Sequence, residues 1–192
     1  MNRVRVLASA RVGAIYGKTD VVVVHARAQR LDRASRLALA AAQQVAALAD
    51  AADCGVFVLT RFGAIAANAE HWSKFKGGGI GAVSPLIFPS TVPSAAAAEV
   101  AIALQAMGPN FTLCGDASLI PELWRLAEDA LAIGDCTHAL VGAVDGWHPV
   151  LERFGLKESD VDGACFALLG PGDHTPHFHH DTSIVRAFDR SL

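Results

Sequence analysis

Short apolar runs alternate along the chain with longer segments in which apolar residues recur at helical spacing. The short runs are rich in valine and other strand-forming residues, so they predict β-strands. The predicted strands span residues 3–9, 20–26, 54–60, 111–114, 138–146 and 163–170, with 182–188 as a further candidate. The run at 54–60 is apolar on both sides, which is typical of a strand covered by helices on two faces.

Three segments have the spacing of amphipathic or buried helices, and they span residues 33–52, 94–107 and 117–133. The first has Asp32 as its predicted N-cap, and one of its faces carries Leu37, Ala41, Val45, Leu48 and Ala52. The second has Ser94 as its predicted N-cap and is stopped by Gly108-Pro109. Alternating strands and helices predict an α/β domain with a central sheet, formed by residues 1–192 as one unit.

The helix predicted at 117–133 is apolar around most of its circumference, and Pro121 is tolerated in its first turn. Its apolar residues are Leu119, Ile120, Leu123, Trp124, Leu126, Ala127, Ala130, Leu131 and Ile133. We therefore expect this helix to be buried on nearly all sides. Residues 61–93 show no periodicity and contain many glycines and prolines, so they predict a long loop, with "GGGIG" at 77–81 as a flexible part of it.

Composition and charge exclude several classes of protein. The 192 residues are 52% hydrophobic and carry a net charge of −3, which argues against the basic stripe of a nucleic-acid-binding protein. No apolar stretch is long enough to predict a membrane span, and Arg11 interrupts the apolar run near the start, so a signal peptide is not expected. Cys54, Cys114, Cys136 and Cys165 show no CxxC spacing, which favours reduced thiols in a cytoplasmic protein.

The stretch "GPNFTLCGDASLIPELWRLAEDALAIGD" at 108–135 has the layout of a nucleophile site: a strand, a tight turn and a helix. A helix N-terminus stabilises a thiolate or an oxyanion there. The turn position is Ala117, however, and Cys114 precedes it by three residues. The simplest interpretation of the turn is a cap in which Asp116 or Ser118 satisfies backbone N–H groups; a surviving oxyanion pocket is the alternative.

The tail "HTPHFHHD" contains His177, His179 and His180, which are possible metal ligands. They lie in an irregular segment for which the sequence indicates no second shell, so we favour a solvated loop over a specific metal site. Asp145 directly follows a predicted strand. No cofactor is expected.

Two stretches, "VSPLIFPSTVPSAAAAEVAIALQAMGPNFTL" and "EDALAIGDCTHALVGAVDG", resemble the N-terminal half of a β-ketoacyl synthase of the thiolase fold. The matching positions are Gly108, Pro109, Thr112, Gly134, Ala139, Gly142 and Asp145, without a gap between them. The resemblance implies a structural role, without chemistry, for Asp145. The resemblance extends over residues 30–170 and implies a mixed central sheet with helices on both faces. The short ketosynthase-like proteins that accompany polyketide-type synthases, such as those making aryl polyenes, are the most similar group.

The resemblance also implies where chemistry is missing. The family's nucleophilic cysteine corresponds to Ala117, between Asp116 and Ser118, and Cys114 corresponds to a strand-end aspartate. The two catalytic histidines and the lysine of the family belong to a C-terminal half that has no counterpart in these 192 residues. Because condensation needs both the nucleophile and the histidines, the resemblance implies a half-length homologue without condensing activity of its own.

Two classes of function remain open. In the first, the chain is a silent partner, similar to a chain-length factor, in a polyketide or fatty-acid pathway. The family's dimerisation implies a homodimer, or a heterodimer with a full-length ketosynthase, and possibly an acyl carrier protein as a further partner. The predicted contact is Phe111, Thr112, Leu113 and Cys114, with the start of helix 117–133. In the second, the chain is a small acyltransferase or thioesterase that uses Cys114 or a histidine.

Overall fold

The computed structural model describes residues 4–17, 21–26, 28–47 and 51–172. Five strands form one sheet in the order β1-β5-β4-β2-β3. The strands are β1 (Val4–Val12), β2 (Cys54–Thr60), β3 (Asn110–Cys114), β4 (His138–Asp145) and β5 (Gly163–Pro171). β2 runs parallel to β3 and β4, and β5 runs antiparallel to β4 and β1, so the sheet is mixed as expected. The strand predicted at 182–188 lies outside the described residues.

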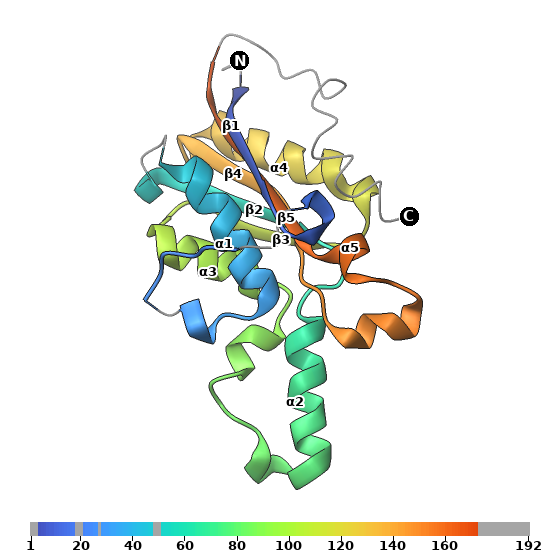
Figure 1. Cartoon of the computed structure of the whole chain (residues 1–192). Helices are drawn as coiled ribbons and strands as arrows, with labels where there is room; N and C mark the ends of the chain where they lie inside the picture. Colours follow the sequence, from blue (N-terminus) through green and yellow to red (C-terminus); the bar gives the residue numbers. More distant parts are fainter. Residues whose placement is uncertain (1–3, 18–20, 27, 48–50, 173–192) are drawn as a thin grey trace.

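Helices cover both faces of the sheet (Figure 1). They are α1 (Arg33–Ala46), α2 (Ile65–Gly78), α3 (Ala95–Leu104), α4 (Ile120–Ile133) and the short α5 (Glu158–Val161). One hydrophobic cluster joins α1 and α3 to the sheet, and a second joins α4 to the opposite face. β2 is therefore buried along its whole length, as its sequence predicted. The predicted α/β class, with a mixed sheet between two helical layers, is confirmed.

α1 begins where the sequence predicts, because the Asp32 carboxylate accepts a hydrogen bond from the Ser35 amide at 2.9 Å. The helix is rich in alanine and buries most of its surface, and it packs closely against α3. It ends at Ala46, earlier than the predicted residue 52. Ser94 precedes α3 as predicted, but its side chain makes no capping hydrogen bond.

The predicted strand at 20–26 is wrong for its described part. Residues 21–26 alternate in exposure, but they form no strand and pair with no described strand. The Gln43 side chain on α1 takes the place of a neighbouring strand: its amide donates to the Val24 carbonyl at 2.8 Å and accepts from the Val24 N–H at 3.3 Å. Val22 and Val24 face outward, at 78% and 79% exposure. The alternation indicated an extended chain but could not indicate its partner.

The predicted loop at 61–93 is also wrong, because α2 and two 3₁₀ helices, Ile80–Ala82 and Phe88–Thr91, occupy most of it. α2 has no apolar periodicity, since Ala67 is its only buried residue. Its residues favour helix, a Glu70–Lys74 ion pair spans one turn, and Gly79 ends it with a φ of 67°. These local signals were present in the sequence.

α4 is amphipathic, so the expectation of a helix buried on nearly all sides is wrong. Ile120, Leu123, Trp124, Ala127 and Ala130 pack under the sheet and are buried within the chain. On the outer face the Arg125 guanidinium donates to the Glu122 carboxylate, one turn before it, and to the Asp129 carboxylate, one turn after it. The chain thus covers the apolar side of α4 by itself.

A buried ion pair ties the start of α1 to the start of β5. Arg33 donates to both carboxylate oxygens of Asp162, with its Nε 2.8 Å from Oδ1. Asp162 is 0% exposed, and its Oδ1 also accepts the Trp147 amide at 3.1 Å. Hydrogen bonding to Asp162 raises the pKa of Arg33. The pair joins three segments that are distant in sequence.

We predict that Arg33→Ala lowers the free energy of unfolding by about 3 kcal/mol, because it leaves the Asp162 carboxylate buried without its counter-ion. Urea unfolding measures the change. Arg36→Ala is the matched control, since Arg36 is exposed on the same helix, and its effect should stay within about 0.5 kcal/mol. Equal losses in both variants would contradict the structural role of the pair.

Candidate functional site

The carboxyl ends of the three parallel strands meet at one edge of the sheet. β2 ends at Thr60, β3 at Cys114 and β4 at Asp145, and Thr60 lies opposite Cys114 in the strand register. In open α/β sheets, ligands bind at the carboxyl ends of the strands. The turn from β3 into α4, where the sequence places Ala117, opens from this edge.

Asp145 organises the turn that follows β2. Its carboxylate is buried, at 5% exposure, and its Oδ1 accepts from the Thr60 hydroxyl at 2.8 Å, the Phe62 amide at 2.9 Å and the Arg61 amide at 3.0 Å. The Thr60 hydroxyl in turn accepts from the Gly63 amide at 2.9 Å. Burial raises the pKa of Asp145 to about 6, although these donors and the Arg61 guanidinium act in the opposite direction. These are the contacts of a residue that fixes a loop.

The turn between β3 and α4 has the predicted capping residue. The Asp116 carboxylate accepts from the Ser118 amide at 2.9 Å and from the Ser118 hydroxyl, which lowers the pKa of Asp116. A 3₁₀ turn, Ala117–Leu119, follows and continues into α4. The Ala117 side chain is partly buried against the α4-side cluster. A methyl group therefore occupies the position at which this layout would present a nucleophile.

Cys114 and Ala117 belong to opposite faces of the sheet. Val56 and Val58 on β2 pack on the α1–α3 side, so Thr60 and its register partner Cys114 face that side by alternation. Ala117 instead packs on the α4 side. The Cys114 thiol is exposed, and it lies on the face of the sheet opposite to the one on which Ala117 packs.

The other three cysteines are buried. Burial raises the pKa of Cys54 to about 12 and also raises that of Cys136. These two thiols remain protonated near neutral pH, so they are poor nucleophiles. Among the described cysteines, only Cys114 is accessible.

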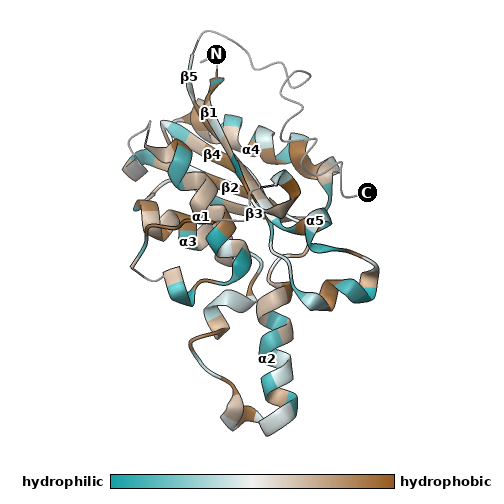
Figure 2. Ribbon diagram, in the orientation of Figure 1, coloured by the Kyte–Doolittle hydropathy of each residue, from teal (hydrophilic) through white to brown (hydrophobic). Residues whose placement is uncertain are grey.

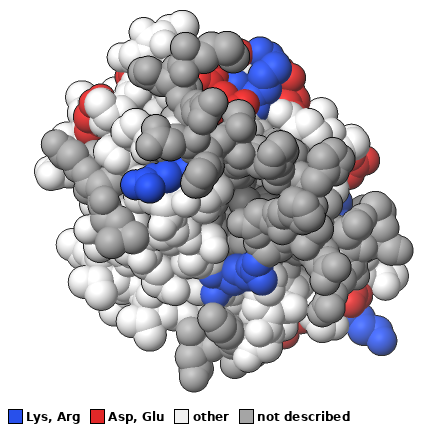
Figure 3. Space-filling model, turned by 90° about the horizontal axis from the view of Figure 1, so that it is seen from above, with Lys and Arg blue, Asp and Glu red and all other residues white. Residues whose placement is uncertain are grey.

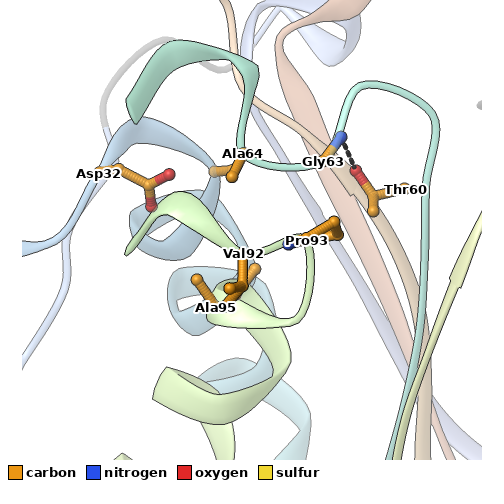
Figure 4. Close-up of a pocket in the computed structure, with 9 residues that line it drawn as sticks. Asp32, Thr60, Gly63, Ala64, Val92, Pro93 and Ala95 are labelled. Carbon is orange, nitrogen blue, oxygen red and sulfur yellow. Dashed lines mark hydrogen bonds between the residues drawn. The ribbon is translucent and has the colours of Figure 1, made fainter. Parts of the chain in front are cut away.

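A small pocket lies on the α1–α3 side of the same edge (Figure 4). It is lined by Asp32, Ala34, Thr60, Gly63, Ala64, Val92, Pro93, Ala95 and Ala96. The two polar side chains of this lining are already engaged, Asp32 in capping α1 and Thr60 with Asp145. The pocket therefore provides a small apolar cleft without a free acid, base or nucleophile on its lining residues.

Three further predictions concern binding. The described part of the chain holds no group of His, Cys, Asp and Glu residues arranged for a metal ion; His177, His179 and His180 lie outside it. On the face seen in Figure 3, Lys and Arg side chains stand in separate groups and form no continuous basic stripe. Of the helices in the described ranges, none has the length and apolar character needed to span a membrane.

Sequence reasoning missed the hydrogen-bond network around Asp145. It also missed α2, the helix that follows the turn held by this network. Thr60 and Asp145 are 85 residues apart, so nothing local links them. The sequence placed Asp145 at the end of a buried strand, the resemblance implied a structural role for it, and its contacts are those of such a residue. It did not identify Thr60, Arg61 or Phe62 as its partners.

We predict that the stability difference between wild type and Asp145→Asn depends on pH. Because the pKa of Asp145 in the folded protein, about 6, exceeds that of a free carboxyl near 4, the folded state retains a proton that the unfolded chain releases between these values. This stabilisation is present below about pH 4 and is lost as the pH rises to 6. Relative to Asp145→Asn, wild type should therefore lose stability over that range in urea titrations.

Asp145→Ala is the control for the hydrogen bonds, because it leaves three donors without an acceptor. We expect it to cost about 3 kcal/mol, whereas asparagine retains one oxygen acceptor. A difference between wild type and Asp145→Asn that is constant from pH 4 to 7 would contradict the raised pKa.

Several solved structures of ketosynthases and their complexes share the thiolase-like fold of this chain. A chain of the ketosynthase ApeO in complex with its chain length factor ApeC, from Xenorhabdus doucetiae, matches with a TM-score of 0.71 and 14% identity, over 90% of this chain and 80% of that one. The AntDE:AntF complex, a type II PKS acyl-carrier protein with its ketosynthase bound to the hexaketide, matches with a TM-score of 0.74 and 15% identity, over 89% and 63%.

The ishigamide ketosynthase/chain length factor matches with a TM-score of 0.67 and 17% identity, over 91% of this chain and 63% of that one. The chain thus spans less than two thirds of the length of the second and third of these relatives. At these identities the structural matches establish the fold alone. No curated protein sequence matches the chain.

The sequence itself matches the family described as beta-ketoacyl synthase, N-terminal domain, over residues 18–158. This range covers well over half of the chain and includes β2, β3, α4 and β4, which build the edge described above. The chain therefore belongs to the family of β-ketoacyl synthase N-terminal domains.

Proposed function

We propose that the chain is a catalytically inactive, ketosynthase-like subunit that pairs with a ketosynthase and acts as a chain-length-factor-like partner. Its setting would be a cytoplasmic polyketide or fatty-acid pathway, of the aryl-polyene type. The observation that carries the proposal is Ala117 at the turn between β3 and α4. Two of the similar structures are complexes or pairs of a ketosynthase with a chain length factor, which supports the role of a partner.

The chemistry of the edge supports a silent role. Without a thiol at position 117 the chain cannot form the acyl thioester that precedes condensation. Cys114 faces the other side of the sheet, away from the N-terminus of α4. The edge has a loop after β2 and a turn after β3 that are both held by hydrogen bonds. Such ordered segments are suited to forming a contact surface with a ketosynthase.

A second candidate is a small enzyme that processes acyl thioesters through Cys114, such as an acyltransferase or a thioesterase. The exposure of Cys114 favours it, because an acyl donor can reach the thiol. The position of Cys114 opposes it, because the thiol lies in a strand and not at a helix N-terminus. The two candidates differ in whether the protein acquires an acyl group.

We predict that malonyl- and acyl-carrier-protein substrates give neither carbon–carbon bond formation nor a covalent acyl adduct, as measured by product analysis and intact mass. Ala117→Cys should also remain inactive in condensation, because the histidines that promote decarboxylation have no counterpart in this sequence. An acyl group on Cys114 would establish the second candidate. Turnover by Ala117→Cys would mean that a partner supplies the missing groups.

The edge of β3 gives the pairing a specific register. Among the described strands, β3 pairs only with β2. The Val56 N–H of β2 donates to the Pro109 carbonyl just before β3, and the Gly115 N–H just after β3 donates to the Thr60 carbonyl of β2. In a parallel ladder, this pattern turns the N–H and C=O groups of Asn110, Thr112 and Cys114 toward the open side. An antiparallel copy centred on Thr112 places Thr112 opposite Thr112 and Asn110 opposite Cys114. That register satisfies all six outward groups of each strand.

We predict a homodimer in isolation, with Phe111–Cys114 in the contact, and a heterodimer when a ketosynthase is present. Thr112→Pro removes an outward donor at the centre of the pairing without removing a bond to β2. It should shift the protein to monomer or aggregate in light scattering, while Thr112→Val, which keeps the backbone donor, should leave the dimer intact. A wild type that stays a monodisperse monomer at micromolar concentration would show that the pairing is wrong.

A further inference from the structure

Residues 65–92 form an arm that leaves the body of the domain after β2 and returns before α3 (Figure 1). α2 is its outgoing limb, and the 3₁₀ helices Ile80–Ala82 and Phe88–Thr91 lie on its return. The Asn68 side chain joins the two limbs near the base, where it donates to the Thr91 carbonyl at 3.0 Å. From residue 68 to residue 92 no side chain is buried within the chain. The arm therefore projects from the domain and holds its shape by contacts with itself.

The tip of the arm, residues 77–88, is apolar and has no charge. From Gly77 to Ala98 the sequence contains neither Asp, Glu, Lys nor Arg, although 18% of the whole chain is charged. Within the tip, Ile80 is 81% exposed, Leu86 76% and Phe88 65%, and Figure 2 shows the apolar colour at this end of the molecule. Exposed apolar surface of this size marks a site for another protein or for a membrane.

Aromatic and basic side chains lie between the tip and the body, on the second half of α2. The rings of Trp72 and Phe75 stack with their centroids 5.4 Å apart, and the Lys76 ammonium lies 5.6 Å from the centroid of the Trp72 ring. Lys74 is exposed and forms an ion pair with Glu70, one turn nearer the body. Tryptophan and lysine are the side chains that lie at the level of lipid headgroups, above a segment that enters the acyl region.

The arm is also positively charged on a chain that is acidic as a whole. Residues 65–92 contain Lys74 and Lys76 against Glu70, two positive charges and one negative, whereas the 192 residues carry a net charge of −3. Both lysines precede the tip directly, and Glu70 lies farther from it. An anionic surface therefore attracts this end of the arm. It repels the outer face of α4, where two carboxylates flank a single guanidinium.

The apolar side chains stand on all parts of the arm and not on one face of it. Trp72 lies on the outgoing limb, Ile80 where the limbs join, and Phe88 on the return, and all three are largely exposed. A protein partner covers one side of a projecting arm, whereas a bilayer surrounds an inserted tip on every side. This distribution favours a lipid surface over a protein surface.

The backbone of the tip is partly satisfied by its own turns, which lowers the cost of leaving water. The Gly79 N–H, at the end of α2, donates to the Phe75 carbonyl at 2.8 Å, and the Ala82 N–H donates to the Gly79 carbonyl at 3.1 Å. On the return limb the Ser90 N–H donates to the Ile87 carbonyl at 2.9 Å. The tip can thus enter the interface without first changing its fold.

We propose that the arm attaches the protein to a lipid bilayer with anionic headgroups, with its tip, residues 77–88, inserted at the boundary between headgroups and acyl chains. Trp72 then lies at headgroup level, and Lys74 and Lys76 contact lipid phosphates. This attachment goes beyond the proposed function and does not depend on it, because it requires neither a ketosynthase nor the pairing along β3.

Sedimentation with vesicles tests the attachment. Vesicles of equal parts phosphatidylcholine and phosphatidylglycerol should carry down the wild type, and vesicles of phosphatidylcholine alone should bind it about tenfold more weakly. Phe88→Ser and Ile80→Ser should each raise the lipid concentration for half-binding about tenfold or more, because each removes an inserted apolar side chain. Phe154→Ser and Ile133→Ser are matched controls, with similar exposure, 68% and 73%, and a position outside the arm, and they should bind as wild type does.

The lysines are tested separately from the apolar tip. Lys74→Gln/Lys76→Gln should weaken binding to the vesicles that contain phosphatidylglycerol and leave the weak binding to phosphatidylcholine unchanged. An equal loss on both kinds of vesicle would overturn the electrostatic part of the proposal.

Trp72 reports the depth of insertion in the native protein. The chain has three tryptophans, and Trp124 is buried and Trp147 half-buried, so Trp72 is the exposed one. Vesicles should shift its emission to shorter wavelength, and brominated phosphatidylcholine, mixed in place of the ordinary lipid, should quench it. Trp72→Phe should lose both signals and still sediment with the vesicles, since it keeps an aromatic ring.

Three results would overturn the proposal. The first is wild type that remains in the supernatant at millimolar anionic lipid. The second is equal sedimentation of wild type, arm variants and controls, which would assign lipid binding to another surface. The third is a weakened self-association of Phe88→Ser and Ile80→Ser in analytical ultracentrifugation without lipid binding by wild type, which would assign the arm to a second copy of the chain. None of these results bears on the silent role proposed above, which acyl transfer and pairing with a ketosynthase test.

Discussion

Two crossovers that run in opposite directions around β2 determine this structure. The chain passes from β2 outward to β3, and then returns past β2 to β4. Because crossovers between parallel strands are right-handed, a reversal of direction moves the connecting helix to the other face of the sheet. α3 accordingly packs with α1 on one face, and α4 packs on the other. The complete burial of β2, and that of β4 from Ala139 onward, follows from this reversal.

The same reversal explains why the missing nucleophile is not replaced by the nearby thiol. Cys114 follows the alternation of β3 and faces the α1–α3 side, whereas Ala117 opens α4 and faces the α4 side. Positions 114 and 117 lie on different faces of the sheet, so a thiol at position 114 does not occupy the site of a thiol at position 117. The buried carboxylate of Asp145 meanwhile keeps the neighbouring loop in place, independently of any chemistry at position 117.

The sequence predicted the parts of the fold whose surroundings are uniform. β2 and β4 are covered on both faces, so their apolar runs were sufficient evidence, and Asp32 capped α1 as expected. It failed where a partner distant in sequence decides the outcome, as when Gln43 replaces a strand beside Val24. It also failed for α2, whose apolar side chains face solvent and leave no period to detect. The Asp145 network joins residues over 80 positions apart, beyond any local signal.

The distribution of apolar surface also changes the physical argument for assembly. Leu123 and Trp124 on α4 are buried under the chain's own sheet, at 2% and 6% exposure. The outer face of the helix is instead solvated by Arg125 and its two carboxylates. Backbone groups on the open edge of β3 instead lack a described neighbour, and exposed apolar side chains collect nearby. This strand edge, and not α4, is therefore where the described chain carries unpaired groups that a partner strand would satisfy.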